Sequence, residues 1–383
     1  MDEDTVQENL ELSIIIPCLN EEKTLPIVIG KALGSLHRLN IQGEVVVSDN
    51  GSTDNSVSVA KSHGARVVHC SQKGYGNALR CGFENAKGKL LIMGDADDSY
   101  NFEEIDDFVK YLREGYDIVM GTRLKGKIEN GAIPFLHRYL GTPALTFVLN
   151  LFFGTKISDC NCGMRGLTKE AFEKLNLSSA GMEFASEMII KTGIMKLKIK
   201  EIPITLYRDK RDKPPHLHTW RDGWRHLKFM LLYAPNFVFI WPAIIAFVIG
   251  SILLLLQIRG PFVFGSIYMD IHSMILGLTL SIVGISVFEM GMIIKLYSHL
   301  NNYYTKDKIV NWMKKITLEK SLIAGGIILL LGIMADAVIV FDWAKNGFHD
   351  INLSRLAIFG LYFIFVGVSF ISFSFLRAVM EKE

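Results

Sequence analysis

The sequence predicts an α/β domain built on a mostly parallel sheet, followed by an α-helical membrane domain of four spans. Two observations lead to this fold class. Short β-branched segments alternate with amphipathic segments over roughly the first 230 residues, as strands and their covering helices do in a parallel sheet. Four long apolar stretches follow, and the mean hydropathy of +0.27 is typical of a chain with membrane segments.

The strands and helices of the first part follow one another in regular order. Segments rich in Val, Ile and Leu predict strands at residues 12–16, 44–48, 65–69, 89–94 and 117–121. Segments with apolar residues on one face predict intervening helices at residues 22–39, 54–63, 75–86 and 103–113. We therefore expect a sheet with helices on both faces.

The second part contains apolar stretches at residues 236–256, 271–294, 321–341 and 356–376, each about the 20 residues that span a bilayer. Lysines gather in and beside the second connection, at Lys295, Lys306, Lys308, Lys314, Lys315 and Lys320. The first connection contains only Arg259, and the third only Lys345 and Arg355. The positive-inside rule therefore predicts a multi-pass protein of the cell membrane whose N-terminal domain and both termini are cytoplasmic.

The same patterns predict the domain boundaries. An acidic tail occupies residues 1–11, the α/β domain residues 12–218, and the four-helix membrane domain residues 235–383. Between them, residues 219–234 mix tryptophans, cations and apolar residues at helical spacing, which is typical of a helix lying in the membrane interface. Packing of this helix against the sheet is the alternative.

Two acids fall within the predicted spans, Glu289 and Asp336. Carboxylates inside a membrane often mark functional sites. Because both lie toward an end of their predicted span, snorkelling to the interface is equally open.

Charge and cysteine content exclude some classes of protein. The formal net charge of +2 gives no basis for nucleic-acid binding. The five cysteines are scattered, apart from Cys160 and Cys162, whose spacing is too short for an ordinary zinc site. We expect reduced cytosolic thiols.

Polar residues follow each of the first four predicted strands. They are Pro17, Asn20 and Glu21 after the first, Asp49 and Asn50 after the second, Lys73 after the third, and Asp95 and Asp97 after the fourth. The carboxyl ends of parallel strands share one edge of the sheet, where open α/β sheets bind ligands. Paired carboxylates there predict a divalent cation that neutralises phosphates, although such acids also cap helices. The phosphate loop of ATPases and the G-x-G-x-x-G of dehydrogenases are missing.

Several motifs together resemble a known family. The first are Ser13-Ile-Ile-Ile-Pro17-x-x-Asn20-Glu21, Asp49-Asn50-Gly-Ser-Thr-Asp54 and Asp95-Ala-Asp97. They resemble the inverting family 2 glycosyltransferases, which have a GT-A fold. The later motifs are Gly121-Thr-Arg123, His137-Arg138, Asp159-Cys-Asn-Cys-Gly163-Met-Arg165 and Glu201-Ile-Pro203, and they are similar to those of dolichyl- and polyprenyl-phosphate sugar synthases.

The resemblance implies a role for each matching residue. Nucleotide-binding residues would be Pro17, Asn20, Glu21, Asp49, Lys73 and Asp95. Asp95 and Asp97 would hold Mg²⁺ or Mn²⁺, and the catalytic residues would be Asp97, Arg123 and Arg138. The phosphate of the acceptor would meet Arg123, Arg138 and Arg165. Judged from the residues themselves, Arg208 and Arg211 fit either a lid that closes on the acceptor phosphate or a basic loop facing solvent and headgroups. Asp159 fits either an orienting role for Arg165 or a capping role. Leu19, Asn50 and Ser99 depart from the family pattern, which leaves base and sugar specificity open.

The implied reaction transfers a hexose, mannose or glucose, from a GDP- or UDP-sugar to dolichyl or polyprenyl monophosphate with inversion, which gives a β-linked product. A lipid phosphate is already anionic, so the chemistry needs charge stabilisation more than a general base. A processive polysaccharide synthase and a non-catalytic transporter or sensor module are the alternatives; the Q-x-x-R-W signature of the former is absent. Glu187 fits either substrate orientation or an exposed helix face. A homo-oligomer stays open.

Overall fold

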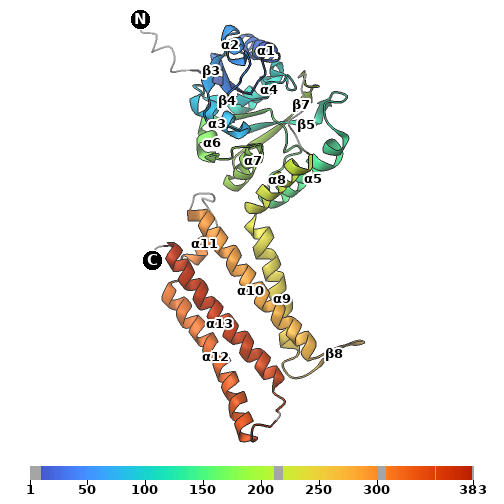
Figure 1. The fold of residues 1–383 in the computed structure, drawn as a ribbon, viewed down its shortest axis with the longest axis vertical. Coiled ribbons are helices and arrows are strands. Elements are labelled where there is room, and N and C mark those ends of the chain that lie inside the picture. Colours follow the sequence, from blue (N-terminus) through green and yellow to red (C-terminus); the bar gives the residue numbers. More distant parts are fainter. Residues whose placement is uncertain (1–9, 211–218, 301–307, 350, 382–383) are drawn as a thin grey trace. The chain divides into compact units, whose positions relative to one another are not determined.

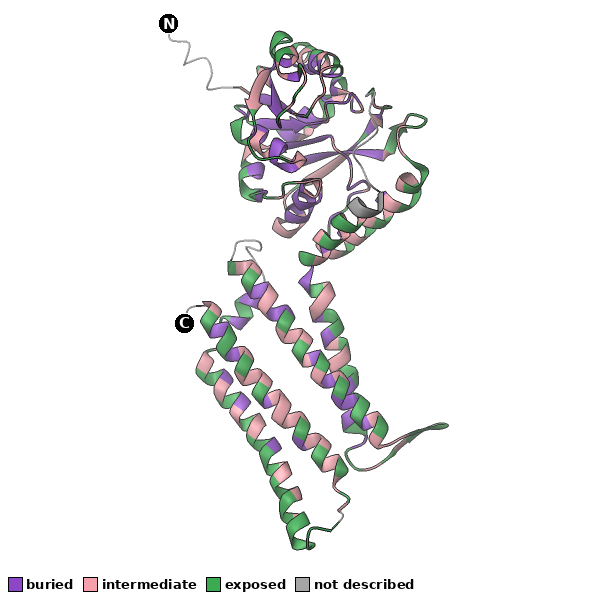
Figure 2. Cartoon of the chain, in the orientation of Figure 1, coloured by how far each residue is buried: buried purple, intermediate pink, exposed green. Residues whose placement is uncertain are grey.

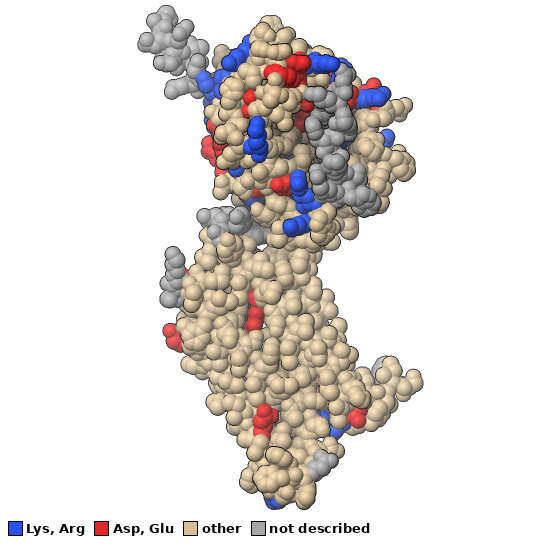
Figure 3. Space-filling view, viewed as in Figure 1, with Lys and Arg blue, Asp and Glu red and all other residues tan. Residues whose placement is uncertain are grey.

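A computed structural model of the chain describes residues 10–210, 219–300, 308–349 and 351–381. The chain forms two compact units, Met1–Tyr233 and Ala234–Glu383 (Figure 1). Charged side chains gather on the first unit, whereas the visible face of the second is almost entirely uncharged (Figure 3).

The first unit is built on a seven-stranded sheet of order β3-β2-β1-β4-β6-β5-β7. The strands are β1 (Leu12–Cys18), β2 (Gly43–Asp49), β3 (Arg66–His69), β4 (Leu90–Met93), β5 (Ile118–Ile128), β6 (Arg165–Thr168) and β7 (Ile199–Leu206). Only β6 runs antiparallel to its neighbours, β4 and β5. The prediction of a mostly parallel α/β sheet is confirmed.

Helices cover both faces because successive residues of each strand point to opposite sides. On β1, Ile14 and Ile16 pack with α1 (Leu25–Arg38), α2 (Ser56–Ser62) and α4 (Asp106–Arg113). Ile15 packs in the second cluster, with residues of α3 (Tyr75–Asn85), α5 (Thr142–Phe153), α6 (Lys169–Leu175), α7 (Phe184–Met195) and α8 (Thr219–Leu232). Figure 2 shows the buried residues concentrated along this sheet.

The strands β6 and β7 were not among the strands predicted from the sequence. β6 has only four residues and contains a glycine, which weakens a strand pattern. β7 contains Pro203, which cannot donate a ladder hydrogen bond. It is accommodated because β7 is the last strand of the sheet, where one side needs no partner.

Among its described residues, the second unit contains four helices that are long and apolar enough to cross a membrane, as predicted. They are Asn236–Leu256, which joins a π-helical turn (η4, Asn236–Ile240) to α9 (Trp241–Leu256), then α10 (Ile271–Leu300), α12 (Leu318–Lys345) and α13 (Ser354–Glu381). The hairpin β8 (Phe262–Phe264) and β9 (Ile267–Met269) and the short α11 (Lys308–Met313) lie in the connections.

Glycines let these helices approach closely. A Cβ at Gly332 of α12 would come within 2.7 Å of Ile364 N and 2.8 Å of Gly360 O on α13. On the other pair, a Cβ at Gly277 of α10 would come within 2.8 Å of Gly250 O on α9. Small residues at such crossings are typical of helices that pack in a membrane.

Glu289 and Asp336 lie farther from a helix end than the predicted spans placed them. Helix α10 continues from Glu289 to Leu300, and α12 continues from Asp336 to Lys345. The Glu289 carboxylate accepts a 2.6 Å hydrogen bond from Ser369 Oγ on α13, so this acid joins two helices.

Candidate active site

The loops that follow β1, β2, β3 and β4 lie at one edge of the sheet, as parallel pairing requires. Cys18 at the end of β1 is in register with Asp49 at the end of β2, and Asp49 in turn with His69 at the end of β3. The loops brace one another. Asn20 Oδ1 accepts from Thr53 N at 2.7 Å, and Glu21 N donates to Ser56 Oγ at 2.8 Å.

Asp49 organises the turn that begins at its own strand end. The buried carboxylate accepts from Ser52 N at 3.0 Å and Gly51 N at 3.3 Å, and His69 Nδ1 lies 3.2 Å away. Burial acts to raise the pKa of Asp49, but these hydrogen bonds outweigh it and hold the pKa below its usual value. The site therefore has a fixed negative charge at this position.

Asn50 joins the loops after β2 and β3. Its Nδ2 donates to Gln72 O at 2.7 Å, and its Oδ1 accepts from Gly74 N at 2.7 Å. Lys73 Nζ donates to Asn50 O at 2.8 Å. A carboxylate could not donate to Gln72, so this departure from the family pattern has a structural reason.

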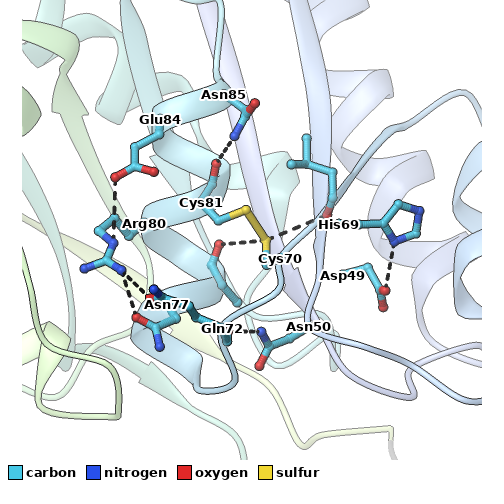
Figure 4. The surroundings of a disulfide bond; sticks show 12 residues. Asp49, Asn50, His69, Cys70, Gln72, Asn77, Arg80, Cys81, Glu84 and Asn85 are labelled. Atoms are coloured by element: carbon cyan, nitrogen blue, oxygen red, sulfur yellow. Dashed lines mark hydrogen bonds and ion pairs between the residues drawn. A yellow bond between two sulfur atoms is a disulfide. The ribbon is translucent and has the colours of Figure 1, made fainter.

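A disulfide joins Cys70, just after β3, to Cys81 on α3 (Figure 4). It closes the loop that contains Lys73 and Gly74. The expectation of reduced thiols is therefore wrong for this pair. Cys18, Cys160 and Cys162 are buried free thiols, and burial raises the pKa of Cys160 to about 11 and of Cys162 to about 12.

The predicted metal ligands Asp95 and Asp97 follow β4 directly. Tyr75 donates its hydroxyl to Asp95 Oδ1 at 2.9 Å. Asp97 is buried, and its Oδ1 accepts from Ser99 N at 3.0 Å and Ser99 Oγ at 2.6 Å. Ser99, which stands where the family often has glutamine, thus orients a carboxylate.

The carboxylates fit a hard divalent cation. Both offer oxygen ligands, which Mg²⁺ and Mn²⁺ prefer. Within the described residues no group of three or more His, Cys, Asp or Glu side chains could hold an ion by itself. Two carboxylates suit an ion that completes its coordination with water and substrate phosphates.

The guanidinium of Arg123, predicted to meet a phosphate, is already paired with a carboxylate in the structure. It forms two side-chain hydrogen bonds with Asp159, Nε to Oδ2 at 2.7 Å and Nη2 to Oδ1 at 2.8 Å, and both residues are buried. The sequence had suggested that Asp159 orients Arg165, but in the structure it orients Arg123. A phosphate contact would have to use the remaining edge of this guanidinium.

Arg165 is fully buried and donates to three backbone carbonyls. Its Nε bonds Cys162 O at 2.9 Å, its Nη2 Cys160 O at 2.9 Å, and its Nη1 Ala185 O at 2.5 Å. The side chain braces the chain before β6 against α7. We therefore correct its assignment from phosphate binding to structural support.

Arg138 and Arg208 are more accessible. Arg138 lies in a π-helical turn (η3, His137–Gly141) and stacks on the Tyr139 ring, 5.3 Å from its centroid. Arg208 follows β7 and is exposed. Arg211 lies outside the described residues.

Glu187 is buried, not exposed. Its carboxylate accepts from Ser178 N and Ser179 N, and it pairs with Lys191 Nζ at 2.7 Å. The loop it holds supplies Ala180 O, which accepts from Gly76 N at 2.9 Å. Glu187 thus supports the loop beside Lys73 from within the fold.

A cavity of about 470 Å³ lies beside this loop. Its lining combines the cations Lys73, Arg225 and Lys228 and the acid Glu183 with the apolar side chains of Phe229 and Leu232. Sequence reasoning had assigned the α8 residues to a membrane-interface helix, with packing against the sheet as the alternative. Met230 of α8 is buried in the second core cluster, so part of this helix does pack there.

An exposed apolar surface on η3 and α5 was also missed. It consists of Phe135, Leu136, Tyr139, Leu140, Phe147 and Leu151, all more than two-fifths exposed. The spacing of these residues resembles an ordinary core helix in the sequence. A basic residue among them, Arg138, was the one available signal of an interfacial role.

Comparisons with known proteins agree with these features. The family model described as "Glycosyl transferase family 2" matches residues 13–176. The model described as "Glycosyltransferase family 2 C-terminal transmembrane region" matches residues 292–381.

Three curated relatives align with this chain over most of their own length. The low-salt glycan biosynthesis hexosyltransferase Agl6 of Haloferax volcanii is 36% identical over 95% of this chain and 88% of its own. The dolichyl-phosphate hexose transferase of Haloferax volcanii is 27% identical over 52% and 84%. The dolichyl-phosphate beta-glucosyltransferase of Drosophila melanogaster is 31% identical over 58% and 74%.

Among solved structures, a glucosyl-3-phosphoglycerate synthase from Mycobacterium tuberculosis in complex with Mn²⁺ and uridine-diphosphate-glucose gives a TM-score of 0.47 at 20% identity. The match covers 59% of this chain and 79% of that chain.

Proposed function

Because the chain belongs to glycosyltransferase family 2 and contains the family's C-terminal transmembrane region, we propose that it transfers a hexose from a nucleotide sugar to a polyprenyl or dolichyl monophosphate. That it is a glycosyltransferase of the GT-A fold with apolar membrane helices follows from the family. The donor, the acceptor and the residue roles below are the proposal.

The observation that carries the donor side is the pair Asp95 and Asp97 at the carboxyl end of β4. Asp49, Lys73 and the loop after β1 lie at the ends of the neighbouring strands. In this assignment Pro17, Asn20, Glu21 and Asp49 contact the nucleoside, and Lys73 lies at the diphosphate. A bound Mg²⁺ or Mn²⁺ would neutralise the leaving nucleoside diphosphate.

The acceptor side is supported by cations next to apolar surface. Arg138 lies among the exposed apolar residues of η3 and α5, and Arg225 and Lys228 line the cavity beside Phe229. A phosphate with a long isoprenoid chain needs both kinds of contact. Two of the relatives are named as dolichyl-phosphate hexosyltransferases, which favours the same acceptor class.

The residues of the chain then have simple tasks. Asp97, held by Ser99, and Asp95, held by Tyr75, keep their carboxylates aimed at the donor. Arg138 and the free edge of Arg123 hold the attacking phosphate oxygen, which needs no deprotonation. Guanidinium groups suit this because their planar fork meets phosphate oxygens in pairs. Direct displacement at the anomeric carbon inverts it and gives a β-linked product.

The test is turnover by the full chain reconstituted in lipid vesicles. The protein is incubated with Mn²⁺, polyprenyl phosphate and either GDP-[¹⁴C]mannose or UDP-[¹⁴C]glucose, and the mixture is extracted with organic solvent. We expect acid-labile label in the organic phase with one of the donors. Label in an aqueous polymer would support a processive synthase, and absence of turnover with every donor would refute the proposal.

A further inference from the structure

Asp98 is a buried acid next to the proposed metal ligands that the reaction above does not use. It is 1% exposed and has a backbone φ of +60°. Among residues with a side chain, Asp and Asn adopt this left-handed conformation most readily. The backbone turns here, directly after Asp97, so that the Asp98 carboxylate points into the protein.

Two lysines neutralise Asp98 from different elements. Lys31 Nζ of α1 lies 2.7 Å from Oδ1, and Lys210 Nζ lies 2.6 Å from Oδ2. Lys210 belongs to the segment that follows β7 (residues 207–210, the post-β7 segment). The carboxylate therefore joins α1 to a segment whose lysine lies 112 residues beyond Asp98 in the chain.

Backbone hydrogen bonds continue this junction. Lys210 N donates to Asp97 O at 3.2 Å, and Tyr207 N donates to Ser99 O at 3.0 Å. Tyr100 forms a bridge with Leu206, the last residue of β7. The loop of residues 95–99 (the carboxylate loop) and the post-β7 segment are thus attached to each other by both backbone and charge.

The junction lies between two proposed functional groups. Asp97 immediately precedes Asp98 in the carboxylate loop. Arg208, a candidate for phosphate binding, lies in the post-β7 segment, where its backbone N–H donates to Glu129 Oε2 at 2.7 Å. Loss of the Asp98 charge would remove both ion pairs, whereas the two backbone hydrogen bonds between these segments would remain.

We propose that Asp98 is a positioning residue for glycosyl transfer, which acts by fixing the carboxylate loop against Lys31 and Lys210. It sets the direction of Asp97 and the place of Arg208 without touching substrate. This inference rests on the proposed function, because it needs Asp97 to serve the donor. Precise placement is a large part of catalysis, so a small displacement is costly.

The first test is Asp98→Asn, which keeps the side-chain shape and tolerates the positive φ. We expect kcat/KM to fall about 10- to 100-fold, with a higher Mn²⁺ concentration needed for half-maximal turnover. The matched control is Asp106→Asn. It removes the ion pair of Asp106 with Arg38, which likewise anchors α1, in this case to α4, but here both side chains are 48% exposed. This control should behave as the unmodified protein.

Lys210 provides an independent test. Its side chain is 54% exposed, so replacing it removes the ion pair without leaving a lysine buried beside a neutral partner. Lys210→Met should shift kcat/KM and the Mn²⁺ dependence in the same direction as Asp98→Asn. Lys210→Arg should restore both. When Asp98→Asn and Lys210→Met are combined, the losses of kcat/KM should be less than additive, because both changes remove the same ion pair.

A readout without turnover separates this proposal from the proposed function. Hydrogen exchange at the Tyr207 and Lys210 amides should accelerate in Asp98→Asn, and thermal-shift titration with Mn²⁺ plus a nucleoside diphosphate should show weaker binding. Unmodified protein without any turnover would refute only the proposed function. A folded Asp98→Asn with unchanged Mn²⁺ dependence and kcat/KM would overturn the positioning role. If Asp98→Asn does not fold, unchanged kinetics of Lys210→Met would do the same.

Discussion

At Asp97 a single carboxylate combines a structural contact with a proposed catalytic one. The backbone N–H and the hydroxyl of Ser99 both donate hydrogen bonds to Asp97 Oδ1. Asp97→Asn keeps the shape of the side chain but removes the negative charge that a divalent cation requires. We expect turnover to fall at least about 100-fold with an unchanged thermal unfolding temperature. Activity within a few-fold of the unmodified protein would contradict the metal assignment.

Glu187 leads to a pH-dependent prediction. Burial acts to raise its pKa, but Lys191 and Ser179 outweigh this and hold the pKa below its usual value. Its stabilising effect is therefore complete above the unfolded pKa of about 4.3, and it is lost as pH falls through the lower folded pKa.

Glu187→Gln leaves Lys191 buried beside a neutral partner, which should cost about 3 kcal/mol at pH 7. The measurement is thermal unfolding of both proteins in detergent across pH 3–8. The difference in unfolding temperature should be largest near neutral pH and shrink below about pH 4. A difference that does not change with pH would argue against the ion pair.

Within the first unit, α5 and its preceding π turn expose an apolar surface that fits a lipid interface. Phe147→Asp places a charge on a side chain that is 66% exposed, so the fold should tolerate it. We expect KM for long-chain polyprenyl phosphate in vesicles to rise about tenfold, with little change for a short, water-soluble isoprenyl phosphate. Ile27→Asp, at an exposed apolar position of α1, is the control. Equal effects of both variants would argue against an interfacial α5.

The α12–α13 pair depends on close approach of the two backbones. Gly332→Leu should separate these helices, because Ile364 and Gly360 fill the space, and should destabilise the protein by about 1–3 kcal/mol. Gly326 of α12 has no neighbour within 4 Å of an added Cβ, so Gly326→Leu is a matched control. The measurement is thermal unfolding in detergent, and only Gly332→Leu should lower the unfolding temperature.

For the whole molecule, the distribution of lysines predicts that the connection containing Lys314 faces the cytoplasm and the connection containing Asn346 faces the other side. A membrane-impermeant maleimide applied to intact cells should label Asn346→Cys. It should label Lys314→Cys only after permeabilisation. The native cysteines give little background, because Cys18, Cys160 and Cys162 are buried and the other two are bonded. The reverse labelling pattern would refute the cytoplasmic placement.

Local pattern determined much of this protein. Apolar runs and their periods predicted the first five strands, the four membrane helices and the carboxylates at the end of β4, because neighbouring residues supply these signals. The lengths of the membrane helices did not follow from the apolar runs, because α10 and α12 extend beyond their predicted spans. A helix continues past the apolar core of a membrane wherever polar residues can still form it.

Tertiary structure decided which charged groups are available. Arg123 and Arg165 look alike in the sequence, yet Asp159 holds one guanidinium and backbone carbonyls before β6 and on α7 enclose the other. The pairing of Asp98 with Lys31 and Lys210 likewise joins segments far apart in the chain. The physical reason is common to all of them: a local pattern fixes the period and burial of an element, whereas the partner of a buried charge is chosen by the folding of distant segments against it.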